Sequence, residues 1–136
     1  IVDIKIYGES KTLASEASEE ILSNFKKLHQ SLHPWRKGLI YEINEAIQNE
    51  TPFLIEDQEV ISLILRGQEY ENQTKGYFNP AIGKLVSLWG FHSEVPRKEM
   101  PNTKDILKLV EANPSMGNIE IINNKLISTN KFVQVD

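Results

Sequence analysis

The 136-residue sequence contains no cysteine. This absence excludes a disulfide scaffold, a Cys-ligated zinc site, a cysteine nucleophile and a CxxC redox centre within these residues. Positive charge is also scarce, because 15 Lys+Arg stand against 19 Asp+Glu and give a formal net charge of −4. Since phosphate binding needs a basic surface, this balance argues against nucleic acid as the main partner. No stretch of the sequence approaches the roughly 20 apolar residues of a membrane span.

Several motifs that mark catalytic or metal sites are missing as well. The chain has no GxSxG turn, no GxGxxG fingerprint and no Walker loop. His29 and His33 are four residues apart, a spacing that can bind zinc from one helix face. No third ligand is nearby and Pro34 ends the helix there, so we expect no metal at this pair. His92 has no spaced partner, and we do not expect it to bind a metal either.

What the sequence does contain is the apolar periodicity typical of amphipathic helices. Apolar residues recur at three- and four-residue spacing over about residues 10–32 and 58–72. Three shorter apolar stripes are also present. One follows Gly38 directly, and the other two cover residues 79–89 and 103–112. The pattern therefore predicts five helices.

Capping residues predict where these helices begin. Asp57 can cap the second long helix, and Asn102 or Thr103 can cap the last one. Asn79 is a good N-cap, and Pro80 at a first helical position loses no hydrogen bond. In the second long helix the residues expected to face inward are Val60, Ile61, Ile64 and Leu65.

Short or alternating apolar runs predict strands at residues 1–7, 119–122, 126–128 and from about residue 131 onward. Residues 53–55 are predicted to be a short buried strand or a loop. Asn123 and Asn124 separate two of these runs and predict a hairpin turn. Helices outnumber strands, and a hairpin implies antiparallel pairing. We therefore predict an α+β fold in which helices pack on a mixed or antiparallel sheet.

Both ends of the chain lie inside strand-like segments, whereas natural termini are usually frayed and polar. We therefore expect residues to be missing on both sides, so that residues 1–136 are an incomplete fragment of one domain. Any signal peptide or lipid anchor would then lie before Ile1, and the net charge is the charge of a piece.

Residues 33–38 combine rings, cations and a proline in one predicted loop. A flat ring that carries a phosphate can stack on Trp35 and be neutralised by Arg36 or Lys37. The alternative interpretation is a loop that ends a helix and whose tryptophan covers the core. Composition alone favours this alternative.

Residues 76–83 join two predicted helices and offer free backbone N–H groups to an anion. Asn79 can hydrogen-bond the edge of a ring there, or it can cap its helix while Tyr77 and Phe78 serve as packing. Asp136 ends an apolar segment, which suits either a site at the sheet edge or the first residue of a loop. The residues alone thus indicate a soluble α+β domain that can bind a planar anionic ligand.

One long segment carries a more specific signal. Residues 76–91 read GYFNPAIGKLVSLWGF, which resembles the pattern G-x-[FYM]-[DN]-x-[TA]-[VI]-G-x-L-V-x-L-W-G-F of the FAD:protein FMN transferase (ApbE) family. Asn44 matches an earlier family motif, and Pro101 before the next helix fits as well. The last four residues resemble the strand that opens the family's D-[LF]-G-x-x-x-K-G segment. The resemblance covers essentially the whole chain and implies that residues 1–136 are the N-terminal part of a single flavin-transferase domain.

This resemblance implies an enzyme that moves FMN from FAD to a threonine hydroxyl of a target flavoprotein, with release of AMP and a requirement for Mg²⁺. Some members of the family hydrolyse FAD to FMN and AMP, so an FAD pyrophosphatase is an alternative. A non-catalytic module that only binds flavin is another. Family members act outside the cytoplasmic membrane as lipid-anchored or exported proteins. The resemblance therefore implies a periplasmic location, with membrane attachment only through an anchor outside this chain.

The resemblance also implies which residues contact FAD. They are Tyr77, Phe78, Asn79, Asp136 and, from the first loop, either His33 or Trp35. No catalytic or metal-binding residue is implied within residues 1–136, because the family's Mg²⁺ ligands and base are expected beyond residue 136. The 136-residue piece alone is therefore expected to be inactive.

Overall fold

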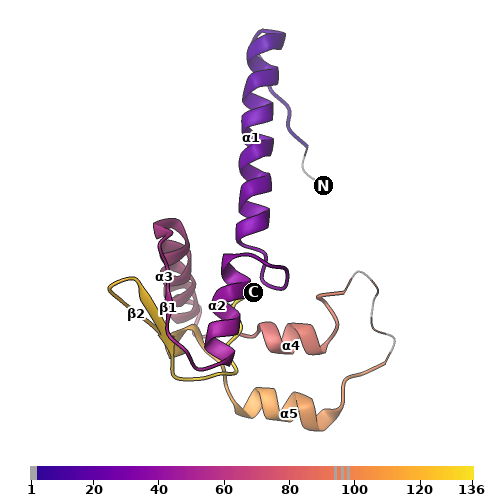
Figure 1. Ribbon diagram of the computed structural model, residues 1–136. Coiled ribbons are helices and arrows are strands. Elements are labelled where there is room, and N and C mark those ends of the chain that lie inside the picture. Colours follow the sequence, from indigo (N-terminus) through magenta and orange to yellow (C-terminus); the bar gives the residue numbers. More distant parts are fainter. Residues whose placement is uncertain (1–2, 94, 96, 98) are drawn as a thin grey trace.

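The computed structural model describes residues 3–93, 95, 97 and 99–136. Its helices and strands follow one another in an order that mixes the two types (Figure 1). They are α1 (Lys11–Ser31), α2 (Leu39–Gln48), β1 (Phe53–Leu54), α3 (Gln58–Gln73), α4 (Gly83–Leu88), α5 (Thr103–Glu111), the short 3₁₀ helix η1 (Met116–Asn118), β2 (Ile119–Ile122) and β3 (Lys125–Ser128). The predicted α+β class is confirmed.

The three strands form one antiparallel sheet in the order β1-β3-β2. In the hairpin, Ile119 pairs with Ser128 and Ile122 pairs with Lys125. Asn123 and Asn124 both have positive φ, 51° and 62°, as a two-residue hairpin turn requires. The predicted hairpin is confirmed.

The core lies between α2, α3, η1 and the sheet. Its fully buried members come from all of these elements and from the chain end, and include Ile43, Ile47, Ile64, Met116, Leu126 and Val133. As predicted, Asp57 caps α3, and its Oδ1 accepts from the N–H of Glu59 at 2.8 Å. Leu65 was expected to face inward but is half exposed, because it lies one residue past Ile64 on the helix and turns off the buried face.

Gly67 lies within α3, where glycine has low helix propensity, and it has a packing role there. It is buried, and a Cβ atom added there would lie 3.1 Å from the Cε of Met116. The glycine therefore leaves room for the end of the Met116 side chain, at a helix-propensity cost of about 1 kcal/mol relative to alanine.

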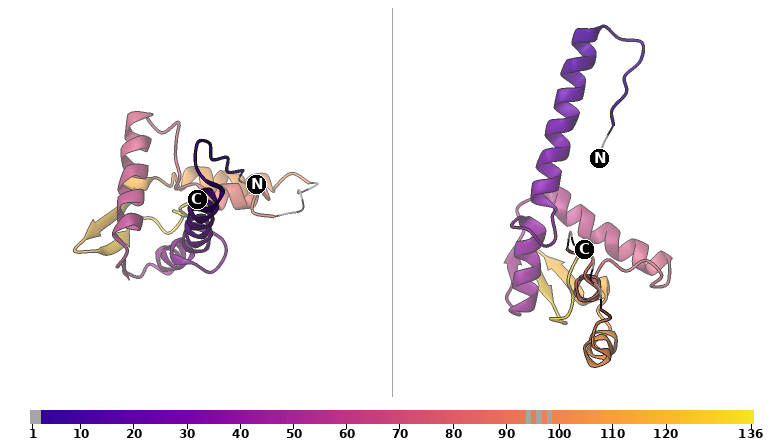
Figure 2. Two further views of the ribbon diagram at one scale, coloured as in Figure 1. Left: turned by 90° about the horizontal axis from the view of Figure 1, so that it is seen from above. Right: turned by 90° about the vertical axis from the view of Figure 1, so that its right-hand side faces the viewer.

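The long helix α1 is confirmed, with Ser10 as its N-cap. However, none of its residues is buried, and the large apolar side chains of Leu13, Leu22 and Phe25 are about half exposed. In both figures α1 projects away from the sheet and the other helices (Figures 1 and 2). No helix among the described residues combines the length and apolar character needed to cross a bilayer.

The fourth helix begins later than predicted. Asn79 does not cap it, because α4 starts at Gly83 and Ile82 occupies the N-cap position. Residues 80–82 instead form a turn and a single bridge beside the chain end, where Asp136 N donates to Pro80 O at 2.9 Å and Gly83 N donates to Gln134 O at 2.8 Å. A Cβ atom at Gly83 would lie 2.7 Å from that carbonyl oxygen, so this close approach requires glycine.

The strands predicted at the two ends of the chain are not found among the described residues. Residues 3–7 have no strand, and Ile1 and Val2 lie outside the described residues. Near the other end, the predicted strand reduces to a single parallel bridge between Ile82 and Gln134. The loop predicted between α4 and α5 holds no helix or strand in its described part, and its residues 94, 96 and 98 lie outside the described residues.

Candidate functional site

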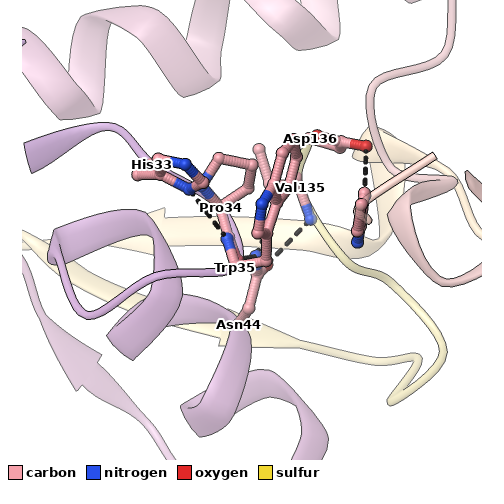
Figure 3. A network of polar contacts seen from close by, with 7 residues as sticks. His33, Pro34, Trp35, Asn44, Val135 and Asp136 are labelled. Atoms are coloured by element: carbon pink, nitrogen blue, oxygen red, sulfur yellow. Dashed lines mark hydrogen bonds and ion pairs between the residues drawn. The ribbon is translucent and has the colours of Figure 1, made fainter. Parts of the chain in front are cut away.

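The candidate site is built around the last residues of the chain, which two different elements hold. On one side, residues 80–83 provide the backbone hydrogen bonds described above. On the other side, Asn44 of α2 holds Val135 with its side chain (Figure 3). Asn44 Oδ1 accepts from Val135 N at 2.8 Å, and Asn44 Nδ2 donates to Val135 O at 2.9 Å. The backbone that carries Asp136 is therefore fixed from both sides.

The Asp136 carboxylate contacts a histidine that lies after the end of α4. The His92 Nε2 atom lies 2.9 Å from Asp136 Oδ2, and the two side chains are only 11% and 18% exposed. The imidazole also stacks on Trp35, with 4.0 Å between ring centroids and 16° between ring planes. Carboxylate, imidazole and indole thus form one continuous row.

His33 extends this row toward α1. Its ring meets Trp35 edge-on, with 4.7 Å between centroids, and its Nδ1 accepts from Trp35 N at 3.4 Å (Figure 3). Burial lowers the pKa of His33, and the positive charges of Arg36, His29 and His92 lower it further, whereas Asp136 raises it. His33 is thereby biased toward the neutral form, which can accept or donate a hydrogen bond at the site.

A cavity of about 320 Å³ lies beside this row. Asp136 lines it, together with apolar and aromatic side chains that include Leu32, Pro34, Tyr70, Phe78 and Pro80, and with one cation, Arg66. Small-molecule sites occupy roughly 300–1,000 Å³, so this cavity can take one ring system of a larger ligand rather than all of it. Aromatic walls and a fixed carboxylate suit a flat heteroaromatic ring that carries N–H donors.

One oxygen of that carboxylate remains available for such a ring. His92 is bonded to Oδ2, and no hydrogen bond to Oδ1 of Asp136 occurs among the described residues. The same part of the chain holds no group of three or more His, Cys, Asp or Glu side chains arranged to bind a metal ion.

The structure does not bring all six predicted residues to this cavity. Phe78 and Asp136 line it, while His33 and Trp35 stand next to it through the row. Tyr77 is 97% exposed and does not line this cavity. The Asn79 side chain is engaged with the backbone, since Nδ2 donates to Pro114 O and Oδ1 accepts from Ala81 N, both at 2.8 Å. Asn79 thus holds its turn, and the predicted helix cap at Asn79 is wrong, because α4 begins four residues later at Gly83.

Sequence reasoning missed two members of the site. His92 was considered only as a metal ligand, and its contact with Asp136 joins residues 44 positions apart in the sequence. Its position directly after the WGF end of the long motif is a signal that could have pointed to it. Arg66 gave no signal beyond being a cation on a predicted helix.

The fold and the cavity define a class of protein, an α+β domain in which a fixed carboxylate lies at a cavity with aromatic and apolar walls. Comparison with known proteins gives the particular family. The model of the ApbE family matches residues 1–136, and the chain belongs to that family.

Individual relatives are distant and longer. The chain is 26% identical over 136 residues to the FAD:protein FMN transferase of Rhodobacter capsulatus, and it spans 26% of that protein's length. It is 22% identical to the flavinyl transferase ApbE of Pseudomonas stutzeri, with a TM-score of 0.72 over 95% of this chain and 39% of that one. The ApbE protein of Thermotoga maritima gives 22% identity and a TM-score of 0.77 over 95% of this chain and 41% of that one.

Proposed function

We propose that the protein to which this chain belongs is an FAD:protein FMN transferase, which moves FMN from FAD to a threonine hydroxyl of a target flavoprotein and releases AMP. The observation that carries the proposal is the family match over all 136 residues. The motif of residues 76–91 and the name of the curated relative support it. The chain spans well under half the length of these relatives, so the activity is proposed for the whole protein.

The proposed reaction is a phosphoryl transfer. The threonine oxygen attacks the phosphorus next to the riboflavin part of FAD, the bond from that phosphorus to the AMP phosphate breaks, and a base takes the hydroxyl proton. Such reactions depend mainly on positioning and on charge neutralisation. Bound Mg²⁺ would supply the charge neutralisation, and we expect its ligands and the base outside residues 1–136.

Within this scheme the residues of this chain bind the ligand. Phe78 offers an aromatic wall, and Asp136 Oδ1 can accept a hydrogen bond from an N–H group of the flavin or adenine ring. Tyr77 presents an exposed ring that a bound ligand can cover, and His33 and Trp35 border the cavity. Asn79 contributes by holding the turn that carries Tyr77 and Phe78. We further propose that the whole protein is exported and acts on the outer side of the cytoplasmic membrane.

A transfer assay tests the proposal. The full-length protein is incubated with FAD, Mg²⁺ and a flavoprotein that carries an acceptor threonine, and the acceptor is then denatured. Flavin fluorescence that stays with the denatured acceptor is the expected result. Free FMN with no labelled acceptor would contradict transfer and indicate an FAD pyrophosphatase, and unchanged FAD would indicate a flavin-binding module.

Tyr77→Ala tests the binding role separately from the fold. Because Tyr77 is 97% exposed, its loss should leave stability unchanged, while FAD affinity falls by about 5- to 20-fold through the lost aromatic contact. Titration of FAD against the full-length variant measures this change. Tyr7→Ala is the matched control, since Tyr7 is also exposed, at 83%, but lies before α1, away from the long motif. Equal affinities for the two variants would contradict the assignment of Tyr77.

A further inference from the structure

His92 is placed by the way in which α4 ends. The chain reverses at Gly90, whose φ is +83°, and Gly90 N donates to Ser87 O while Phe91 N donates to Val86 O. These two bonds form a Schellman motif, which stops the helix within one turn. Two residues later, the His92 side chain is only 11% exposed and lies against Asp136. The end of α4 thus places His92 between Asp136 and Trp35.

We propose that His92 is a positioning residue for FAD binding, which orients the Asp136 carboxylate toward the cavity and seats Trp35 beside it. This inference rests on the proposed function, because it assumes that the cavity receives a ring of FAD. Among the described residues, His92 bonds Asp136 and stacks on Trp35, so it acts through these two side chains.

The contact with Asp136 fixes which carboxylate oxygen is available. A carboxylate can rotate about its Cβ–Cγ bond, and a ligand that needs one oxygen in one place loses affinity to that freedom. The bond of 2.9 Å between His92 Nε2 and Oδ2 removes the rotation and leaves Oδ1 for the ligand. Hydrogen bonds to charged groups are among the stronger ones in proteins, so the orientation should be well held.

The contact with Trp35 fixes the other side of the row. His92 covers one face of the indole at a centroid distance of 4.0 Å, and His33 meets it edge-on. That face of Trp35 is therefore not available for stacking by a flavin. His92 and Trp35 also line a second cavity of about 310 Å³, while Asp136 lines the first and Pro34 lines both. His92 thus lies at the boundary between two cavities.

The test separates the hydrogen bond from the stack. FAD affinity is measured by titration in the full-length protein for His92→Ala, His92→Phe, His92→Gln, Asp136→Ala and the double variant His92→Phe with Asp136→Ala, which keeps a ring on Trp35. We expect a loss of about 10-fold for His92→Phe, which keeps a ring on Trp35 but cannot donate to Asp136. His92→Gln should stay within about 3-fold of the wild type, because its amide N–H can replace the donor. The double variant should bind no more weakly than Asp136→Ala alone.

His29→Ala is the matched control, since His29 contacts the ring of His33 but makes no contact with Asp136. It should bind FAD like the wild type. A wild-type protein that does not bind FAD would overturn the proposed function itself. If the wild type binds and His92→Phe binds equally well, or if the losses in the double variant add, the positioning role of His92 is wrong. If His92→Ala does not fold, as judged by circular dichroism, the Phe and Gln variants still decide the question.

Discussion

Asn44 replaces a neighbouring β-strand at Val135. Its side-chain amide accepts from the backbone N–H and donates to the backbone carbonyl of the same residue, which is how a paired strand would bind it. Gln134 and Asp136 use the opposite edge of the segment for bonds to residues 80–83. Because one amide satisfies two backbone groups, the segment needs no further strand on that side.

Asn44→Ala should therefore lower the free energy of unfolding by about 2–4 kcal/mol, since two partly buried backbone groups would lose their partners at about 1–3 kcal/mol each. Urea denaturation of the full-length protein measures the loss. Asn44→Asp should also destabilise, because the carboxylate keeps an acceptor but loses the donor to Val135 O. Asn72→Ala is the control, since that exposed amide has no hydrogen bond in the part of the chain that the structure describes. A loss below about 0.5 kcal/mol for Asn44→Ala would contradict the role assigned to this amide.

Individual residues show where sequence reasoning stops at this scale. Asn44 was noticed because it matches a motif, but its partner Val135 lies 91 positions away and no local pattern links them. The link between His92 and Asp136 is equally remote in sequence. Asn123 and Asn124, in contrast, were predictable, because a two-residue hairpin turn demands positive φ and asparagine tolerates it.

At the scale of elements, the helix ends share one conformation but not one residue type. A residue with positive φ follows α2, α3, α4 and α5, namely Glu50, Lys75, Gly90 and Asn113. Only α4 uses glycine, for which this conformation carries no steric penalty. Glu50 and Lys75 adopt it at a cost of about 1–2 kcal/mol each, and the Schellman hydrogen bonds offset that cost.

Because Lys75 carries a side chain at positive φ and Gly90 does not, substitutions at these two positions should change stability in opposite directions. Lys75→Gly should raise the free energy of unfolding by roughly 0.5–1 kcal/mol. Glycine relieves the steric strain of a side chain at φ +53°, and this gain exceeds the entropy that glycine adds to the unfolded chain. Gly90→Ala should lower it by about 1–3 kcal/mol, because its φ is +83° and the new Cβ atom would lie 2.8 Å from the Cβ atom of Arg97. Thermal and urea unfolding of the full-length protein measure both. Lys75→Ala serves as the control for loss of the lysine side chain, and a stabilisation by Ala equal to that by Gly would contradict the conformational explanation.

Most elements were predictable because their apolar spacing is set by local burial. The exceptions lie where one segment pairs with another that is far away in sequence. Asn79 and Pro80 are good helix-start signals, yet α4 begins only at Gly83, because residues 80–82 form a turn that bonds the chain end. That chain end has the composition of a strand, yet the Asn44 side chain occupies one of its edges, so it forms only one bridge. Tertiary hydrogen bonds overrode local propensity in both cases.

At the scale of the whole molecule, packing is concentrated in one part of the chain. The core joins α2, α3, η1 and the sheet, while α1 extends away from them (Figure 2). The apolar stripe of α1 was predictable from the sequence, but its partner was not, because spacing identifies a helix face and not what covers it. Among the described residues, nothing buries that stripe.

This uneven packing predicts that α1 is the least stable helix in the 136-residue chain. Isolated helices are marginal without tertiary contacts, so amides 15–28 should exchange with solvent at least about 100-fold faster than amides 62–70 of α3. Hydrogen exchange followed by mass spectrometry on the 136-residue chain measures this difference. A matched pair of truncations gives an independent check. Leu22→Ala, at a side chain 49% exposed, should change the free energy of unfolding by less than about 0.5 kcal/mol, whereas Ile64→Ala, at 0% exposed, should cost about 2–5 kcal/mol. Equal protection of α1 and α3, or equal costs for the two truncations, would mean that α1 packs against the rest of the chain in solution.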